Sequence, residues 1–217
     1  MKIKWNGHAS FTITADDGTT IVTDPYDPAG YGGVLTYEMV TDRADGALIS
    51  HDHLDHNYTA GLKGSPTVLK ESGTVNAIEV NAVAAYHDEA QGSERGPNQI
   101  FTFTVDGVRV CFVGDLGHRL GSDHLNAIGD VDVLLVPVGG TFTVDAKGAA
   151  DVTRAINPRL TIPMHYKTDK CDLPIGKVED FLELMDNVRI LNEPEVVVTP
   201  DSLPKGNTEI WVLTHAR

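Results

Sequence analysis

The amino-acid sequence predicts an α+β fold, a four-layer αββα sandwich in which two β-sheets pack face to face with helices outside. Two features of the chain indicate this fold class. Short strand-like segments fill the first half and recur near the end, whereas helical periodicity is confined to segments after residue 121. No repeat of fixed period is present. With 217 residues the chain is long enough for one well-cored domain and short for two, so a single domain is expected over residues 1–217.

Strands are expected wherever short apolar or alternating runs are bounded by turn residues. The Asp16-Asp17-Gly18 and Asp106-Gly107 turns each predict a hairpin. The segment Ala47–Ser50 ends directly at His51. The predicted strands are Lys2–Trp5, Ser10–Thr14, Thr20–Thr23, Ala47–Ser50, Gln99–Val105, Val108–Val113, Val131–Val136, Arg159–Ile162, Val196–Thr199 and Glu209–Thr214.

Three helices are expected later in the chain, at Ser122–Ile128, Asp145–Ile156 and Gly176–Met185, where apolar residues recur at helical spacing. The segment Tyr26–Tyr37 is glycine-rich and contains Pro28, which is too irregular for a regular element. It is a candidate lid over a functional site.

Composition limits the classes of partner. An apolar content of 41% and a charged content of 22% are typical of a globular domain that lies in water. The net charge of −14 disfavours nucleic acid and anionic lipid as partners, but bound divalent metals would reverse the sign locally, so an anionic small substrate stays open. No apolar run approaches the roughly 18 residues of a transmembrane helix, and the start of the chain lacks a signal-peptide pattern, so a cytoplasmic location is expected. The oligomeric state stays open, a homo-oligomer included.

The two cysteines, Cys111 and Cys171, form no CxxC pair and are too few for a disulfide framework. Cys111 lies in the apolar run VRVCFVG, where a buried thiol is expected.

The segment His51–His56 carries the strongest chemical signal. Three of the nine histidines and two aspartates fall within these six residues, at the end of a predicted buried strand. His51 and His53 are two residues apart in an extended stretch, so their rings are expected on one side, where they can hold one metal. Asp55 and His56 follow the turn and can face a second metal. The alternative is a solvated loop, but such loops favour Lys, Glu, Ser and Gly over imidazoles.

The sequence HDHLDH matches the HxHxDH signature of the metallo-β-lactamase superfamily, and the chain resembles that family over nearly its whole length. The resemblance implies an αββα sandwich with metals at the edge where the two sheets meet. The segments WNGHASF, VGDLGH and IPMHYKT look most like the branch related to the ascorbate-6-phosphate lactonase.

The resemblance also implies three further ligands. His87 in VAAYHDE would complete the first site, Asp115 in FVGDLGH would bridge both metals, and His165 in IPMHYKT would complete the second site. Taken singly, each of the three fits an ordinary buried polar group or strand-end cap. Together, in the expected order, they favour the ligand interpretation. The predicted metal ligands are His51, His53, Asp55, His56, His87, Asp115 and His165.

Three further residues each have two possible roles. His8 in GHASF is expected close to the metals, to bind substrate or carry a proton, unless it is a core histidine bonded to backbone. Asp24 is expected to orient a ligating histidine, or to cap the turn before Pro25. His118 is either a wall of the site or part of an exposed loop.

Other polar residues carry weaker signals. Arg95, Asn98 and Lys167 could contact an anionic substrate, although solvated surface is the favoured interpretation for each. His124 and His215 are expected to be non-functional.

These residues predict a metal-dependent hydrolase. Two divalent ions about 3.5–4 Å apart lower the pKa of a shared water to about 7, and the resulting hydroxide attacks a carbonyl carbon or phosphorus. Asp55, Asp115 and His8 are the predicted catalytic residues, with His8 or His118 protonating the leaving group. Zinc is the family default, and Mn²⁺ or Fe²⁺ also suits imidazole and carboxylate donors. The expected substrate is a small ester, lactone or phosphodiester, an anionic one included.

Two other functions stay open. A di-iron redox protein of the same fold would favour more carboxylate ligands and usually carries a flavin domain. A non-catalytic scaffold predicts damaged ligand positions, and none is damaged here. The hydrolase is therefore the favoured function, although fold alone does not select its substrate.

Overall fold

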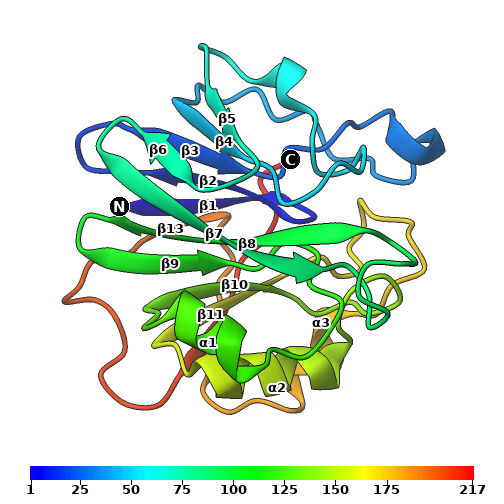
Figure 1. Ribbon diagram of the computed structural model, residues 1–217, viewed down its shortest axis with the longest axis vertical. Helices are drawn as coiled ribbons and strands as arrows, with labels where there is room; N and C mark the ends of the chain where they lie inside the picture. The colour runs from blue at the N-terminus through cyan, green and yellow to red at the C-terminus, as the bar shows by residue number, and fades with distance from the viewer.

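Two β-sheets form the centre of the molecule in the computed structural model, which describes residues 1–217 (Figure 1). The first sheet has the strand order β13-β1-β2-β3-β4-β5. Its strands are β1 (Lys2–Gly7), β2 (Ser10–Thr14), β3 (Thr20–Thr23), β4 (Gly46–Leu48), β5 (Thr67–Leu69) and β13 (Glu195–Val197). The second sheet has the order β12-β14-β11-β10-β9-β8-β7-β6. Its strands are β6 (Gly73–Val75), β7 (Ile78–Tyr86), β8 (Pro97–Val105), β9 (Val108–Phe112), β10 (Val133–Pro137), β11 (Leu160–Met164), β12 (Val188–Ile190) and β14 (Glu209–Val212).

The three α-helices lie on one side of this pair of sheets. In Figure 1, α1 (Ser122–Ile128), α2 (Ala146–Ile156) and α3 (Val178–Leu182) gather below the eight-stranded sheet, where α2 contacts β10 and α3. Helix α2 begins after Asp145, whose carboxylate accepts a hydrogen bond from the Gly148 N–H at 2.7 Å. These positions agree with the predicted helices, except that α3 is shorter at both ends.

Loops and two single-turn 3₁₀ helices, η1 (Gly30–Gly32) and η2 (Thr59–Gly61), replace α-helices outside the six-stranded sheet. Val22 of β3 is buried there in a small cluster with Tyr26, Tyr37 and Val40. The α+β sandwich is thus confirmed, with its second outer layer made mainly of loop.

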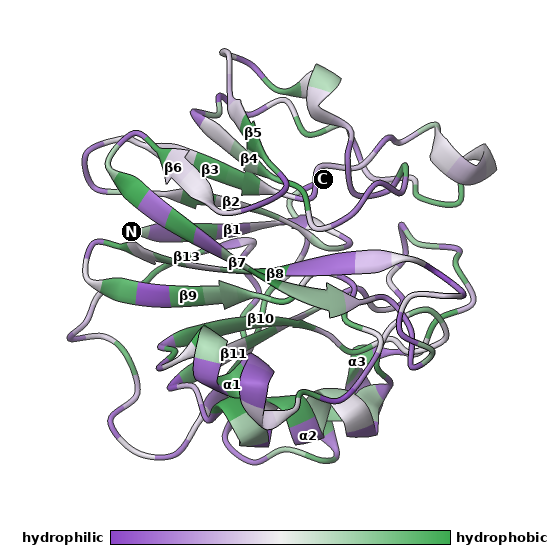
Figure 2. Cartoon of the chain, viewed as in Figure 1, coloured by the Kyte–Doolittle hydropathy of each residue, from purple (hydrophilic) through white to green (hydrophobic).

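The main core fills the space between the sheets. Ile3 of β1 and Phe11 of β2 belong to the same hydrophobic cluster as Phe101 of β8 and Phe112 of β9. Strand β10 is buried at every position, because it pairs in parallel with β9 and β11 and helices cover its other face. Figure 2 shows this strand in the green of hydrophobic residues along most of its length, whereas α1 carries hydrophilic purple segments.

Both predicted hairpins are present. The Asp16–Gly18 turn joins antiparallel β2 and β3, and Asp106-Gly107 joins β8 and β9 with left-handed φ angles of 49° and 76°. Four strands, β5, β6, β7 and β12, were not predicted. The longest of them, β7, is nine residues long and pairs with β8 as far as Tyr86, directly before His87.

The ends of several strands meet at one edge of the sandwich. Asp24 follows β3, and Ser50 and the histidine-rich segment follow β4 in the six-stranded sheet. His87 follows β7, and His165 follows β11 in the eight-stranded sheet. None of the helices is long and apolar enough to cross a membrane.

Candidate metal centre

All seven predicted ligands meet at this edge. One group consists of His51, His53 and His87, and a second consists of His8, Asp55, His56 and His165. Within each group the potential ligand atoms lie within 4.8 Å of one another. Both groups therefore have the density of donors that a metal ion requires.

Asp115 lies between the two groups. Its Oδ2 atom is 3.3 Å from Nε2 of His87 in the first group. The same oxygen is 3.2 Å from Nε2 of His56 and 3.2 Å from Nε2 of His165 in the second group. One carboxylate thus contacts imidazoles of both groups, which is the arrangement of a bridging ligand.

In the first group, Nε2 of His51 lies 3.0 Å from Nδ1 of His53, so the two ring nitrogens converge. The other nitrogen of His51 is 2.9 Å from the Ser50 hydroxyl, which fixes the orientation of the ring. Burial, together with the neighbouring His56, lowers the pKa of His51 to about 2. His51 is therefore a neutral imidazole at physiological pH, the form that ligates metals.

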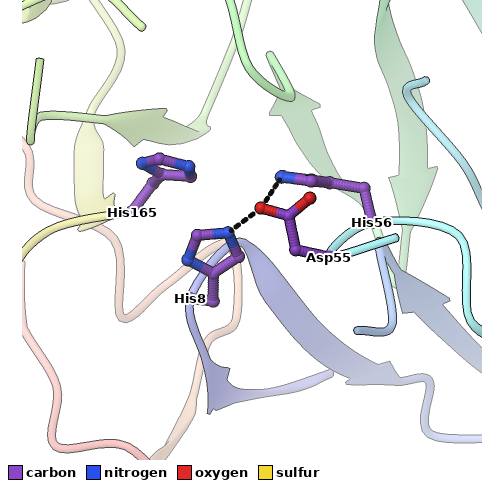
Figure 3. Close-up of side chains that lie close together, drawn as sticks. All are labelled: His8, Asp55, His56 and His165. Atoms are coloured by element: carbon purple, nitrogen blue, oxygen red, sulfur yellow. Dashed lines mark hydrogen bonds and ion pairs between the residues drawn. The ribbon is translucent and has the colours of Figure 1, made fainter. Parts of the chain in front are cut away.

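The second group is drawn in Figure 3. The Oδ2 atom of Asp55 lies 3.1 Å from Nε2 of His8 and 3.5 Å from Nε2 of His56, with the ring of His165 nearby. Burial and the neighbouring His165 lower the pKa of His8 to about 4, although Asp55 acts in the opposite direction. His8 is therefore a neutral donor to the Asp55 carboxylate.

Asp24 is a completely buried partner of this group. Its Oδ2 lies 2.8 Å from Nδ1 of His56, and its Oδ1 accepts a hydrogen bond from the Ser50 N–H at 2.7 Å. The Ser50 hydroxyl donates to the same carboxylate. Asp24 thus orients His56 directly and His51 through Ser50, as the first of its two predicted roles required.

Charge is concentrated at the centre of the site. Burial disfavours the charged form of Asp115, but the imidazoles of His165 and His56 outweigh it and hold the pKa of Asp115 well below its usual range. Burial likewise opposes protonation of His56, yet Asp115 and Asp55 raise the pKa of His56 well above normal. Two buried carboxylates thus retain their negative charge, and without a metal a proton on His56 balances part of it.

The donor set fits divalent ions. Oδ1 of Asp115 is buried without a hydrogen-bond partner, and Nε2 of His56 contacts only the carboxylates of Asp115 and Asp55, at 3.2 and 3.5 Å, without hydrogen-bond geometry. Such orphaned polar atoms are costly in a folded protein unless another group satisfies them. Imidazole and carboxylate donors without a thiolate suit Zn²⁺, Mn²⁺ and Fe²⁺.

Three residues of the site have left-handed backbones. The φ angles are 52° at His8, 34° at Asp24 and 51° at His165. His8 connects β1 to β2, Asp24 follows β3 and His165 follows β11. The His8 carbonyl accepts hydrogen bonds from the His165 N–H at 3.1 Å and from the Trp5 indole N–H at 3.0 Å. The bond from His165 joins the two sheets at the site, and both bonds help to hold a conformation that costs about 1–3 kcal/mol per residue.

Asn98 is a structural support and not a surface residue. It is completely buried, its Oδ1 accepts from the Asp115 N–H at 3.0 Å, and its amide donates to the Val113 carbonyl at 2.9 Å. Gly114 lies between them with φ of 55°, and a Cβ there would lie 2.5 Å from Oδ1 of Asn98. The prediction of a solvated Asn98 was wrong, because the start of β8 packs beneath the Asp115 loop.

The other predicted candidates lie away from the centre. The Nε2 atom of His118 accepts a hydrogen bond from the Tyr86 N–H at 3.1 Å, so this ring caps the end of β7. Lys167 faces Asp172 at 3.5 Å on the surface. His215 is 2.8 Å from a carboxylate oxygen of Asp169.

A cavity of about 400 Å³ opens beside the metal-binding groups. The predicted lid contributes Tyr31 and Val34 to its wall. Two buried tyrosines fix the ends of this segment. The Tyr26 hydroxyl lies 3.0 Å from the carbonyl oxygens of both Asn6 and Glu38. The Tyr37 hydroxyl forms a hydrogen bond with the Thr168 hydroxyl. Backbone hydrogen bonds also hold Asp27 to Leu54 and Val34 to Asp172, so the tip of the segment lies between Asp27 and Val34. The remaining residues that line the cavity are His53, Asp55, His87, Arg95, Asp115, Phe142, His165 and Leu173.

Comparison with known proteins gives a consistent result. A family model described as a β-lactamase superfamily domain matches residues 2–165. The chain is similar to a crystal structure from Thermotoga maritima, a proposed zinc-dependent hydrolase of the metallo-β-lactamase superfamily, with 35% identity, a TM-score of 0.79 and coverage of 98% of this chain and 99% of the other.

Two curated relatives are named metal-dependent hydrolases. The protein from Methanoculleus marisnigri is 32% identical over 77% of this chain and 82% of its own length. The protein from Carboxydothermus hydrogenoformans is 27% identical over 91% of this chain and all of its own length.

Proposed function

This chain belongs to the metallo-β-lactamase superfamily, and we propose that it is a hydrolase that depends on two divalent metal ions. In this proposal, residues 1–217 act as one domain that cleaves an ester, lactone or phosphodiester bond of a small molecule. The observation that carries the proposal is the position of Asp115 Oδ2, within 3.3 Å of His87 on one side and 3.2 Å of His56 and His165 on the other. The names of the relatives support the same reaction class.

The two groups of donors divide naturally between two ions. We assign one ion to the three histidines of the first group and the other to Asp55, His56 and His165, with Asp115 shared. Zinc is the preferred metal, and Mn²⁺ or Fe²⁺ suits the same donors. When bound, two such ions lower the pKa of a water molecule to about 7 and polarise the oxygen of the electrophile.

The side chains of the protein orient the reacting groups. Asp55 and Asp115 stay ionised at neutral pH, so their carboxylates can accept a hydrogen bond from the attacking water and orient it. Asp24 holds the His56 ring in place. We propose that His8 positions Asp55, because its side chain is buried, donates to that carboxylate and is not part of the cavity wall.

The first experiment is elemental analysis of the purified protein after gel filtration without chelator. About two zinc or manganese ions per chain would support the proposal and justify a screen of lactones, esters and phosphodiesters. Two irons with a visible absorption band would favour redox chemistry, and failure to bind metal even on reconstitution would leave a scaffold.

The bridging role of Asp115 is tested by Asp115→Ala. We expect this variant to lose metal and turnover together. A matched control is Asp52→Asn, which changes an exposed aspartate of the same His51–His56 segment. Full metal content and full turnover in Asp115→Ala would contradict the assignment.

A further inference from the structure

The cavity beside the metal-binding groups combines an apolar wall with one cationic group. Tyr31, Val34, Phe142 and Leu173 supply the apolar surface. Arg95 is the only lysine or arginine in the lining. A volume of about 400 Å³ lies in the range of small-ligand sites, in which apolar walls give affinity and a few polar groups give orientation.

The Arg95 side chain is held along this wall. Its guanidinium carbon lies 5.9 Å from the centre of the Phe142 ring, and one Nη atom donates to the Thr141 carbonyl at 3.3 Å. The other Nη atom lies 3.5 Å from Glu94. A guanidinium has five N–H donors, so donors remain for a ligand. With about a third of its side chain exposed, Arg95 is accessible from the cavity.

The loop that carries Arg95 is built around a buried carboxylate. Asp88, next to His87, accepts backbone hydrogen bonds from Ala90, Gly92, Glu94 and Arg95 at 2.7–3.1 Å. The conformation of this loop is therefore fixed by its own hydrogen bonds and does not depend on a ligand. Because His87 begins it and Arg95 ends it, the guanidinium has a defined position relative to the metal-binding groups.

The electrostatics explain why one cation matters here. The chain carries a net charge of −14, and Asp55 and Asp115 both face the cavity. The two divalent ions assigned under the proposed function would offset these two carboxylates, and Arg95 is the one cationic side chain of the lining that is free to hold a charge on the ligand. Arg95 can pair with one carboxylate group through two parallel N–H···O bonds. If Arg95 only packed on Phe142, replacing it would not change the preference between an anionic ligand and its neutral analogue.

We propose that Arg95 recognises a carboxylate on an otherwise apolar ligand, so that the substrate is a small ester or lactone with an apolar body and a single carboxylate. The assignment of the cleaved bond to an ester or lactone rests on the proposed function, whereas the preference of Arg95 for a ligand with a carboxylate does not. Arg95 is a specificity-determining residue in this scheme, and the apolar wall accepts the remainder of the substrate.

The test uses phenylacetate and its neutral analogue phenylacetamide as probes, with binding to the metal-loaded protein measured by calorimetry. We expect phenylacetate to bind about tenfold more tightly, as one charge-assisted pair implies. Arg95→Gln should bring the two affinities within about threefold of each other, and Arg95→Lys should retain part of the preference because it keeps charge without the planar fork. Arg119→Gln removes a cation outside this cavity and should leave the preference unchanged.

The outcomes separate this inference from the proposed function. Equal affinities in the wild type, a preference that survives in Arg95→Gln, or no binding of phenylacetate would each overturn the role of Arg95. Ester hydrolysis without any preference for a carboxylate would also contradict it, while leaving the hydrolase intact. Conversely, Arg95-dependent binding in a protein that hydrolyses no ester, lactone or phosphodiester would contradict only the proposed function.

Discussion

The Nδ1 atom of His56 lies 2.8 Å from Oδ2 of Asp24, and both side chains are completely buried. The same Asp24 carboxylate accepts hydrogen bonds from the backbone and hydroxyl of Ser50, which in turn contacts His51. One aspartate that is not itself in the metal-binding sequence motif therefore sets the orientation of two of its histidines.

Asp24→Asn should weaken metal binding about 10- to 100-fold, the usual effect of losing a partner that orients a ligand. Asparagine tolerates the left-handed backbone at this position, so the fold should persist. Competition with a chromophoric chelator measures the affinity. Asp52→Asn, at an exposed carboxylate that pairs with Lys70, serves as the control, and equal affinities in the two variants would contradict the role of Asp24.

Removal of metal should lower the melting temperature. The donors come from both sheets, with His51 after β4 and His165 after β11, so bound ions would link the two halves of the sandwich. Ligand present at about a thousand times its Kd stabilises by about 4 kcal/mol, or roughly 10 °C for a chain of this size. Scanning calorimetry with a chelator, followed by added Zn²⁺, measures the loss and its recovery. Asp115→Ala should show almost no shift.

The metal-stripped protein should lose stability in mild acid through His8. Burial, followed by the neighbouring His165, lowers the pKa of His8 to about 4 from the ordinary value of 6.5. The unfolded chain therefore binds more protons between these values, and the free energy of unfolding decreases as pH falls from about 7 to 4. The contribution of this one residue is on the order of 3 kcal/mol.

His8→Asn isolates that contribution, since asparagine accepts a φ of 52° and does not titrate. Urea unfolding of both proteins at several pH values should give a shallower pH dependence in the variant. Identical slopes would mean that His8 is not a buried neutral imidazole in the folded protein.

Gly114→Ala should destabilise the fold by about 3 kcal/mol, because alanine is strained at the left-handed φ of 55°. Its Cβ would also lie 2.5 Å from the Asn98 and Ser50 side chains, both of which support the site. Metal affinity should fall with stability, since Asp115 follows directly. Gly206→Ala, where nothing lies within 4 Å, should change stability by less than about 0.5 kcal/mol in the same denaturation experiment.

The convergence of His51, His87, Asp115 and His165 was predicted from the resemblance to the metallo-β-lactamase superfamily. In the structure each of them follows the end of a strand, and strand ends of a sandwich meet at its edges. The HDHLDH segment also places several donors close together in sequence, so no long-range contact had to be inferred for them. The two hairpins could also be predicted, because the Asp-Gly sequence at each turn specifies a hairpin locally.

Strand β7 was missed for a physical reason. Only Val80 and Ala85 of this strand are buried, and its alanines have low strand propensity, so the pattern IEVNAVAAY lacks a clear period of two. Antiparallel pairing of its residues Val80–Tyr86 with Pro97–Phe103 of β8 stabilises it instead. Strands β5, β6 and β12 have three residues each, which is too short for any periodicity to be recognised.

The support given by Asn98 depends on contacts between segments about 15 residues apart, which spacing does not reveal. Its only local sign is Gly114 before Asp115, because glycine there allows the close approach of Asn98. Arg95 is similar, since its position follows from the Asp88-centred loop, and a sequence pattern cannot distinguish that loop from an ordinary solvated turn.

The two buried tyrosines at positions 26 and 37 have a consequence for how this enzyme could acquire new substrates. Insertions or deletions between Asp27 and Val34 would change the Tyr31 side of the cavity, while the tyrosine hydroxyls and the backbone bonds of Asp27 and Val34 hold the flanking chain in place. The opposite side offers no such freedom, because Arg95 shares its short loop with His87. Related proteins that act on different substrates should therefore differ mainly in the number of residues between the positions of Tyr26 and Tyr37.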